Sequence, residues 1–229
     1  ILKIDSLNLV KTKSINKVIW FGHSAVLMQL NGKNILFDPM LGDVPAPHPL
    51  LGPSRYYDEL PMEIEALPVI DYIFISHDHY DHLDMGSIEK LKSKTKRFYV
   101  PIGVGAHLIE WGVAKDKIHE MAWWDETTSD SLFIAFAPSR HFSGRDFSRN
   151  TTLWGSWIVK ADNQNVYFSG DSGYGPHFKS IGEKYGAFDF AMLECGQYND
   201  KWSEIHMSPE ATAQAGLDIN AKVFMPIHW

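Results

Sequence analysis

The segment from His77 to His82 places three histidines and the carboxylate of Asp81 within six residues. His77 and His79 are two positions apart, so in an extended chain their side chains point the same way and can bind one metal ion. Asp81 and His82 follow as the chain turns, and they can point at a second site close by. Imidazole nitrogens and carboxylate oxygens suit zinc, with iron or manganese as alternatives. A solvated loop that is merely rich in histidine is the competing interpretation, and this spacing disfavours it.

The neighbouring sequence predicts where this segment lies in the fold. Residues 71–75 form a short apolar and aromatic run, which is typical of a buried strand. Residues 85–94 predict a helix with Ile88 and Leu91 facing inward. The histidine-rich segment therefore leaves the C-terminal end of a strand, which is where open α/β sheets usually bind their ligands.

Other polar side chains also follow predicted strands. Three of them do so far along the chain: His141 after 132–137, Asp171 after 165–169 and His228 after 222–227. Either histidine alone would more often be an ordinary surface residue, and the shared position at strand ends is what favours a ligand. Two metal ions with about three ligands each and one shared carboxylate would use seven residues. These are His77, His79, Asp81, His82, His141, Asp171 and His228.

The remaining pattern predicts a strand-rich chain with a few helices. Asn31-Gly32 between two apolar runs is typical of a two-residue hairpin, because that turn needs positive φ at both positions. Further strands are expected at 17–23, 25–30, 34–38, 97–100, 153–159 and 188–193, and further helices at 104–111 and 178–185. Ser208-Pro209-Glu210 predicts the start of a helix that runs to Leu217. Residues 40–62 are rich in proline and glycine and predict either a lid or pocket wall or a floppy insertion.

Length and composition favour one α/β domain over residues 1–229, and 45% hydrophobic residues support a sizeable core. A net charge of −7 argues against a nucleic acid as partner. Cys195 is the single cysteine, so no intrachain disulfide can form. No apolar run reaches the roughly 18 residues of a membrane span. The chain begins without methionine, so we expect it to be part of a longer protein. We expect a cytoplasmic location and leave peripheral membrane contact and the oligomeric state open.

The motif His77-x-His79-x-Asp81-His82, followed by His141, Asp171 and His228, resembles that of the metallo-β-lactamase superfamily. More narrowly, the chain resembles the branch of the N-acyl-phosphatidylethanolamine-hydrolysing phospholipase D and its bacterial relatives. The narrower resemblance rests on Trp20-Phe21-Gly22-His23-Ser24, Asp38-Pro39, His82-Leu83-Asp84, His141-Phe142-Ser143-Gly144-Arg145, Thr152-Leu153-Trp154-Gly155-Ser156, Gly170-Asp171-Ser172-Gly173-Tyr174 and His206-Met207-Ser208-Pro209-Glu210. The family chain continues past its His-Trp pair with a further strand and helix, whereas this sequence ends at Trp229.

This resemblance implies an α/β fold, the αββα sandwich of two mixed sheets flanked by helices, with two divalent metal ions at one edge. The implied ligands are His77, His79 and His141 for the first metal, Asp81, His82 and His228 for the second, and Asp171 as the bridge. Asp38 and His23 would orient ligand histidines by hydrogen bonds, and His206 would face the substrate phosphate. The alternatives are a turn residue for Asp38, which precedes Pro39, and a surface histidine for His206.

The same resemblance implies a metal-dependent hydrolase of a small-molecule or lipid phosphodiester. A water molecule between two metals would lose its proton near neutral pH and attack phosphorus. Asp81 or Asp171 would orient that water, and His206 would stabilise or protonate a phosphoryl oxygen. A hydrolase of lactones, amides or other carboxyl esters is the main alternative, and a non-catalytic metal-binding sensor is a third. Asp171 and His79 disfavour a true β-lactamase, which lacks the bridge, and a flavin-linked di-iron relative, which has glutamate in place of His79.

Overall fold

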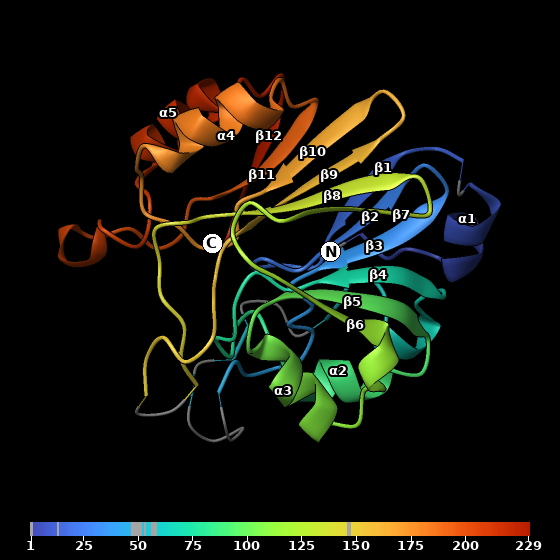
Figure 1. Cartoon of the computed structure of the whole chain (residues 1–229). Helices are drawn as coiled ribbons and strands as arrows, with labels where there is room; N and C mark the ends of the chain where they lie inside the picture. The colour runs from blue at the N-terminus through green and yellow to red at the C-terminus, as the bar shows by residue number, and fades with distance from the viewer. Residues whose placement is uncertain (1, 13, 47–51, 53, 56–58, 146–147) are drawn as a thin grey trace.

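Two mixed β-sheets of six strands each face one another in the computed structural model (Figure 1). The structure describes residues 2–12, 14–46, 52, 54–55, 59–145 and 148–229. The first sheet contains β1 (Lys17–Trp20), β2 (Val26–Leu30), β3 (Lys33–Phe37), β4 (Ile70–Phe74), β5 (Thr95–Pro101) and β6 (Ile118–Met121). The second contains, in spatial order, β12 (Phe224–Ile227), β11 (Phe190–Glu194), β10 (Gln164–Phe168), β9 (Ser156–Ala161), β8 (Leu132–Ala137) and β7 (Glu126–Ser129).

Each sheet joins an antiparallel half to a parallel half. Strands β1 to β3 pair antiparallel and β3 to β6 parallel, while β7 to β10 pair antiparallel and β10 to β12 parallel. In each parallel half, the C-terminal strand ends lie at one edge of the sheet, so the segments that leave these strands gather there.

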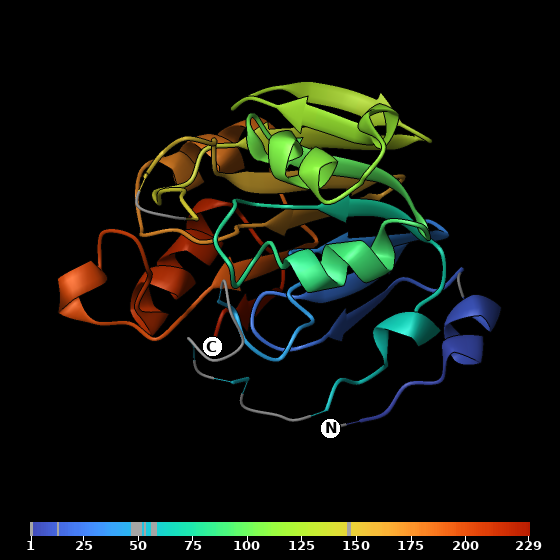
Figure 2. The same ribbon diagram turned by 90° about the horizontal axis from the view of Figure 1, so that it is seen from below.

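Helices cover the outer faces of both sheets. Helices α2 (Met85–Leu91) and α3 (Val104–Glu110) lie on the first sheet, as Figure 2 shows from below, and α4 (His177–Tyr185) and α5 (Pro209–Asp218) lie on the second. The other helical segments are α1 (Ser6–Lys11) and the 3₁₀ turns η1 (Ile64–Ala66), η2 (Lys115–Lys117) and η3 (Asp200–Trp202). The expected α/β class, two mixed sheets with flanking helices, is therefore confirmed.

The core between the sheets is aromatic. The rings of Phe37 and Phe168, from opposite sheets, stack with centroids 4.8 Å apart, and Trp157 meets Phe74 edge-on at 5.0 Å. Trp157 is fully buried, and its indole N–H donates to the carbonyl of Ile75 at 2.9 Å. This bond joins the second sheet to the chain that leaves β4, directly before the histidine-rich segment.

Several expectations from sequence are confirmed at the level of local structure. Asn31 and Gly32 have φ of 47° and 68° and connect β2 to β3 as an antiparallel hairpin. The Ser208 hydroxyl accepts the N–H of Ala211 at 3.2 Å and caps α5, with Pro209 at the first helical position.

Other boundaries differ from the sequence prediction. The strand expected over 153–159 begins only at Ser156, because the N–H of Gly155 donates to the carbonyl of Ser76 at 3.0 Å rather than to a neighbouring strand. The helix expected over 85–94 ends at Leu91, and the strand expected over 222–227 begins at Phe224. Helix α1 and strands β6 and β7 were not predicted.

The predicted lid over residues 40–62 lies partly outside the described residues, since 47–51, 53 and 56–58 are not described. Within the part of the chain that the structure covers, no helix has both the length and the apolar character needed to cross a membrane.

Candidate metal centre

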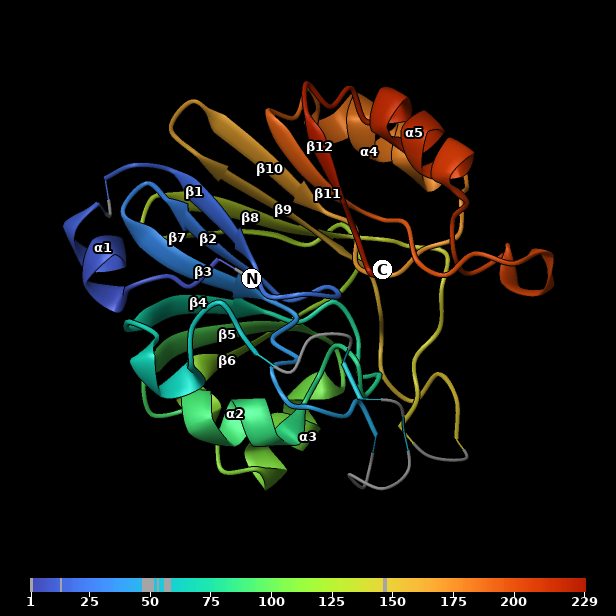
Figure 3. The same cartoon turned by 180° about the vertical axis from the view of Figure 1, so that it is seen from behind.

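The segments that carry the seven predicted ligands gather at one edge of the sandwich. His77 and His79 follow β4, His141 follows β8, and Asp171 follows β10. The chain ends beyond β12 at this same edge, where loops of both sheets meet, so His228 arrives there too (Figure 3).

Three histidine nitrogens form the first cluster. His79 Nδ1 lies 2.8 Å from His77 Nε2 and 3.2 Å from His141 Nε2. Burial lowers the pKa of all three rings, well below the usual value for His77 and to about 3 for His141. The three rings are therefore neutral near pH 7, and their nitrogen lone pairs point at a common region.

Two aspartates and two histidines form the second cluster. His82 Nε2 lies 3.1 Å from Asp171 Oδ1, and His228 Nε2 lies 3.0 Å from Asp171 Oδ2. Asp81 Oδ2 lies 3.4 Å from His228 Nε2 and 3.7 Å from His82 Nε2. Asp171 Oδ2 also lies 3.6 Å from His141 Nε2, so this carboxylate contacts both clusters.

Charge dominates the titration of the second cluster. Burial alone would lower the pKa of both histidines, but Asp171 and Asp81 raise it well above the usual value for His82 and to about 10 for His228. Burial would raise the pKa of the two carboxyl groups, but His82 and His228 hold it well below the usual range. Without a metal, the second cluster therefore holds protons that the first does not.

The donor set fits bound cations. Three buried atoms of the second cluster, His82 Nε2, Asp171 Oδ1 and His228 Nε2, make no hydrogen bond within the described part of the chain. Buried polar atoms are rarely left unsatisfied, and such exceptions call for a partner. Four histidine nitrogens or carboxylate oxygens, from His23, Asp81, His82 and His228, lie within 4.8 Å of one another, as do three from His77, His79 and His141. Nitrogen and carboxylate donors at these separations suit divalent cations.

Neighbouring groups fix the orientation of these rings. Asp38 Oδ2 accepts from His82 Nδ1 at 2.7 Å, and the carbonyl of Ile205 accepts from His141 Nδ1 at 3.1 Å. Ser76 Oγ lies 2.9 Å from His77 Nδ1. Each contact leaves the other ring nitrogen, Nε2, facing the cluster.

The structure places the remaining predicted residues as follows. Asp38 is fully buried and contacts His82, and His23 Nε2 lies 2.9 Å from Asp81 Oδ2, so both lie where hydrogen bonds can orient predicted ligands. The ring of His206 lies 5.2 Å from the rings of both His141 and His228. His206 is partly buried, and its role as a substrate-facing histidine stays a prediction.

Sequence reasoning missed three neighbours of the site: Ser76, Glu194 and the carbonyl of Ile205. Ser76 directly precedes the histidine-rich segment, which was a usable signal. Glu194 ends the apolar strand β11 and is fully buried, so an acidic residue after a core strand was the available sign. A backbone carbonyl carries no sequence signal.

A cavity of about 1290 Å³ opens onto the second cluster. His23, Asp81, His206 and His228 are among its lining residues. The lining is mainly apolar and includes Trp20, Phe21, Met40, Trp202, Ile205 and Trp229. Met40, Pro45, Ser54, Arg55, Glu59 and Pro61 also line it, so the described parts of 40–62 form a wall of this cavity. This supports the pocket-wall interpretation of that segment.

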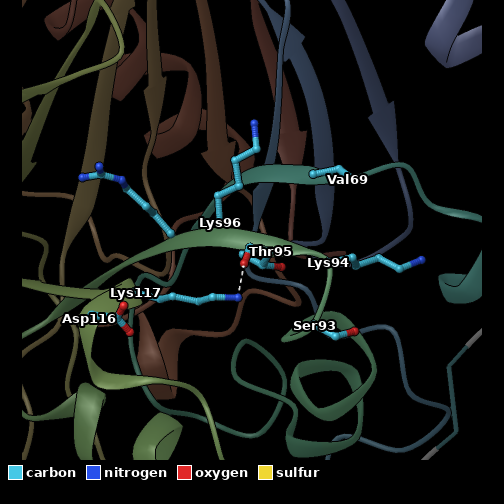
Figure 4. Close-up of a pocket in the computed structure, with 8 residues that line it drawn as sticks. Val69, Ser93, Lys94, Thr95, Lys96, Asp116 and Lys117 are labelled. Atoms are coloured by element: carbon cyan, nitrogen blue, oxygen red, sulfur yellow. Dashed lines mark hydrogen bonds between the residues drawn. The ribbon is translucent and has the colours of Figure 1, made fainter.

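A second hollow, of about 500 Å³, lies where β5 begins and is lined by four basic residues (Figure 4). Strands β4 and β5 are parallel, so this hollow lies at the end of the sheet opposite the histidine clusters. Lys117 Nζ donates to the carbonyl of Thr95 at 2.8 Å, and Lys94 Nζ donates to those of Glu65 and Leu67 at 2.8 and 3.0 Å. These two amino groups therefore anchor backbone turns.

Metal removal should make stability depend on pH in a defined direction. The pKa of His228 is raised to about 10, so its stabilising contribution is complete below about 6.5 and is lost as pH rises through 10. Chelator-treated protein should therefore melt at least about 3 °C lower at pH 9.5 than at pH 6.5, the shift that about 1 kcal/mol produces in a chain of this size. Zinc-loaded protein should not show this fall, because ligand imidazoles carry no proton at the ligating nitrogen. Melting curves across pH 6–10 with and without zinc test this, and parallel profiles would contradict it.

Comparisons with known proteins show the family of this chain. The family described as "Beta-lactamase superfamily domain" matches residues 33–229. The chain is 44% identical to the uncharacterized protein Rv0906 of Mycobacterium tuberculosis over 216 residues, 93% of this chain and 58% of that protein. It is 32% identical to N-acyl-phosphatidylethanolamine-hydrolyzing phospholipase D 1 of Caenorhabditis elegans over 223 residues, 92% of this chain and 62% of that protein.

Among solved structures, Igni18, a metallo hydrolase from Ignicoccus hospitalis, has the same fold, with a TM-score of 0.69 at 23% identity over 93% of this chain and 82% of that chain. The chain spans about three fifths of the length of the M. tuberculosis and C. elegans relatives. From the family match and the shared fold, the chain belongs to the metallo-β-lactamase superfamily.

Proposed function

We propose that this chain is a metal-dependent hydrolase with a dinuclear site and, more narrowly, a phosphodiesterase that acts on phospholipase D-type substrates. The observation that carries the proposal is the position of Asp171. Its carboxylate contacts a cluster of three neutral histidines on one side and the His82–His228 pair on the other. One carboxylate between two donor sets is an arrangement that suits a pair of cations.

The residues divide between two proposed sites. His77, His79 and His141 would hold one cation, Asp81, His82 and His228 would hold the other, and Asp171 would bind both. When bound, two divalent ions lower the pKa of water toward neutrality and draw off negative charge from a phosphoryl group. Zinc is the favoured metal for this donor set, with manganese and iron as alternatives.

The protein's own groups would orient the reactants. Asp81 lines the cavity, and the buried Asp171 lies between the two clusters. Either carboxylate can accept a hydrogen bond from the attacking water. The contact of His23 with Asp81, at 2.9 Å, limits the rotation of that carboxylate. His206 Nδ1 lies 3.1 Å from Glu194 Oε1, so Nε2 is the ring nitrogen left to face the substrate. In the imidazolium form, which has a hydrogen on both nitrogens, Nε2 can donate to a phosphoryl oxygen or to the leaving alkoxide.

The shape of the cavity supports a lipid-like diester. Its lining combines polar side chains of the candidate site with a mainly apolar remainder, which suits a ligand with a phosphate group and long hydrocarbon chains. The name of the C. elegans relative describes such a substrate. The net charge of −7 gives a polyanionic nucleic acid no general attraction to the surface.

The test is an activity screen of zinc-loaded protein. The panel contains bis-p-nitrophenyl phosphate, an N-acyl-phosphatidylethanolamine in detergent micelles, a series of lactones and p-nitrophenyl acetate. Turnover of the diesters alone supports the proposal. Turnover of lactones or carboxyl esters alone would replace it with the alternative hydrolase, and metal binding without any turnover would indicate a sensor.

His206→Ala should lower kcat for the diester about 10²- to 10⁴-fold, the range for loss of a positioned proton donor, with unchanged metal content. The ring is not among the seven predicted ligands, so we expect metal binding to be retained. Elemental analysis and steady-state kinetics measure both quantities. His119→Ala, at an exposed histidine of β6, is the matched control and should retain activity. Lost metal, or undiminished turnover, would remove His206 from the proposed mechanism.

A further inference from the structure

A buried carboxylate that the proposed mechanism does not use lies behind the site. Glu194 ends β11 and has no exposed surface. Its Oε2 accepts the N–H of Met207 at 2.8 Å, and its Oε1 accepts the N–H of Gly196 at 2.8 Å. A buried carboxylate is costly unless it is hydrogen-bonded or paired, so its placement needs a reason.

The same oxygen faces two histidines that have different proposed roles. Glu194 Oε1 lies 3.1 Å from His206 Nδ1 and 3.7 Å from His228 Nδ1. The rings of His206 and His228 are nearly parallel, with centroids 5.2 Å apart and planes inclined by 21°. The Nδ1 atoms of the proposed proton donor and of a proposed metal ligand therefore both point at one carboxylate.

His228 has a particular need for this carboxylate. Its Nδ1 is buried and makes no hydrogen bond to any residue that the structure describes. Glu194 Oε1 is too distant for a full hydrogen bond at 3.7 Å, but a negative charge at this distance still favours a hydrogen on Nδ1. A hydrogen on Nδ1 leaves the Nε2 lone pair available, and Nε2 is the atom that lies 3.0 Å from Asp171.

The backbone keeps the carboxylate and the ring close together. The N–H of Cys195 donates to the carbonyl of Ile227 at 2.9 Å, which ties the end of β11 to the residue before His228. A Cβ at Gly196 would lie 2.5 Å from His228 Nδ1 and 2.7 Å from Glu194 Oε1. Glycine is therefore the residue that this close approach allows.

We infer that Glu194 is a positioning residue that sets the orientation of His228 and His206 together, and so couples the geometry of one metal ligand to that of the substrate-facing histidine. The His206 half of this inference rests on the proposed function. The His228 half concerns metal binding and stands without it.

Glu194→Gln tests the inference with little change in shape. The two carboxylate oxygens accept hydrogen bonds from Gly196, Met207 and His206, whereas glutamine has one oxygen and an amide NH₂ that must face one of these donors. We expect the dissociation constant of the more weakly bound zinc to rise about 10- to 100-fold, as for other residues that orient metal ligands. Competition with a chromophoric chelator measures this constant. We also expect kcat for the diester to fall with little change in KM. Glu183→Gln, at an exposed glutamate of α4, is the matched control.

Gly196→Ala provides a second route to the same geometry, since it keeps the charge of Glu194 but its Cβ would push the His228 ring and the carboxylate apart. It should also weaken zinc binding.

A double variant of Glu194→Gln and His206→Ala tests the coupling. If Glu194 acts through His206, then Glu194→Gln should lower kcat by a smaller factor in the His206→Ala background than in the native protein.

The outcomes are separable. Zinc dissociation constants for Glu194→Gln and Gly196→Ala equal to those of Glu183→Gln would overturn the inference, because a merely structural glutamate would change only the melting temperature of the metal-free protein. If the two substitutions lowered kcat by independent factors that multiply in the double variant, Glu194 would not act through His206. If the native protein hydrolyses no diester, the proposed function fails, and the zinc measurements still decide the His228 half.

Discussion

Asp171→Asn should reduce diester turnover about a hundred- to several-thousandfold and lower the zinc content of purified protein. Asp171 is the carboxylate that contacts both histidine clusters, with oxygens 3.1 Å from His82 Nε2, 3.0 Å from His228 Nε2 and 3.6 Å from His141 Nε2. Asparagine has the same size but carries no charge. Removing one partner from a buried charged group costs about 3–5 kcal/mol, and each 1.36 kcal/mol corresponds to about tenfold in rate or binding.

The same substitution should change the metal-free protein in a way that turnover alone would not reveal. Among the neighbouring groups, Asp171 does most to raise the pKa of His82 and of His228. Without this carboxylate, both histidines should lose much of that elevation, so the fall in melting temperature between pH 6.5 and pH 9.5 should become smaller. Melting curves of chelator-treated protein measure this effect independently of any substrate.

Asp116→Asn is the matched control, because Asp116 is an exposed aspartate of η2 at the opposite end of the first sheet. It should match the native protein in zinc content and turnover. A fully active, fully loaded Asp171→Asn protein would show that the two clusters do not share a carboxylate-bound pair of ions, and the proposed dinuclear site would have to be abandoned.

The strands that bring the site together were predictable because they are buried on both sides. β2 and β4 are mainly apolar, with Gln29 and Asp71 as their polar residues, and every residue of both is buried, so their sequences stand out from the segments around them. In each of the edge strands β6 (IHEM) and β7 (ETTS), two residues are exposed, one is partly buried and one is buried. Their sequences therefore carry little apolar signal. Helix α1 buries only Leu9, which leaves no periodic pattern to detect.

The composition of the candidate site was also largely predictable, and the reason is topological. Polar residues that directly follow core strands collect at one sheet edge, so strand prediction brought His141, Asp171 and His228 to the histidine-rich segment. Their roles as ligands remain predictions. The contacts that orient the rings depend on three-dimensional detail instead: the carbonyl of Ile205 that bonds His141 comes from a loop 64 residues away, and the burial of Glu194 follows from the pairing of β11 with β12.

Asp38→Asn should weaken zinc binding about 10- to 100-fold and lower the free energy of unfolding by roughly 1–3 kcal/mol. Asp38 is fully buried; its Oδ1 accepts the N–H of Ser76 at 2.7 Å, and its Oδ2 accepts from Ser76 Oγ and from His82 Nδ1. In asparagine, the NH₂ group must face either the Ser76 N–H or the His82 Nδ1–H. One buried donor therefore loses its acceptor, and the His82 ring loses its fixed orientation.

This substitution also separates the two interpretations of Asp38. The residue has a positive φ of 38°, which asparagine adopts about as readily as aspartate, so a residue needed only for the turn before Pro39 would tolerate the change. Asp162→Asn is the matched control, since Asp162 is exposed in the β9–β10 turn with a φ of 48°. Chelator competition and denaturant unfolding give the two quantities. If Asp38→Asn were as innocuous as Asp162→Asn in both, the carboxylate would serve the turn alone, and the orientation of His82 would have to come from Asp81 and Asp171.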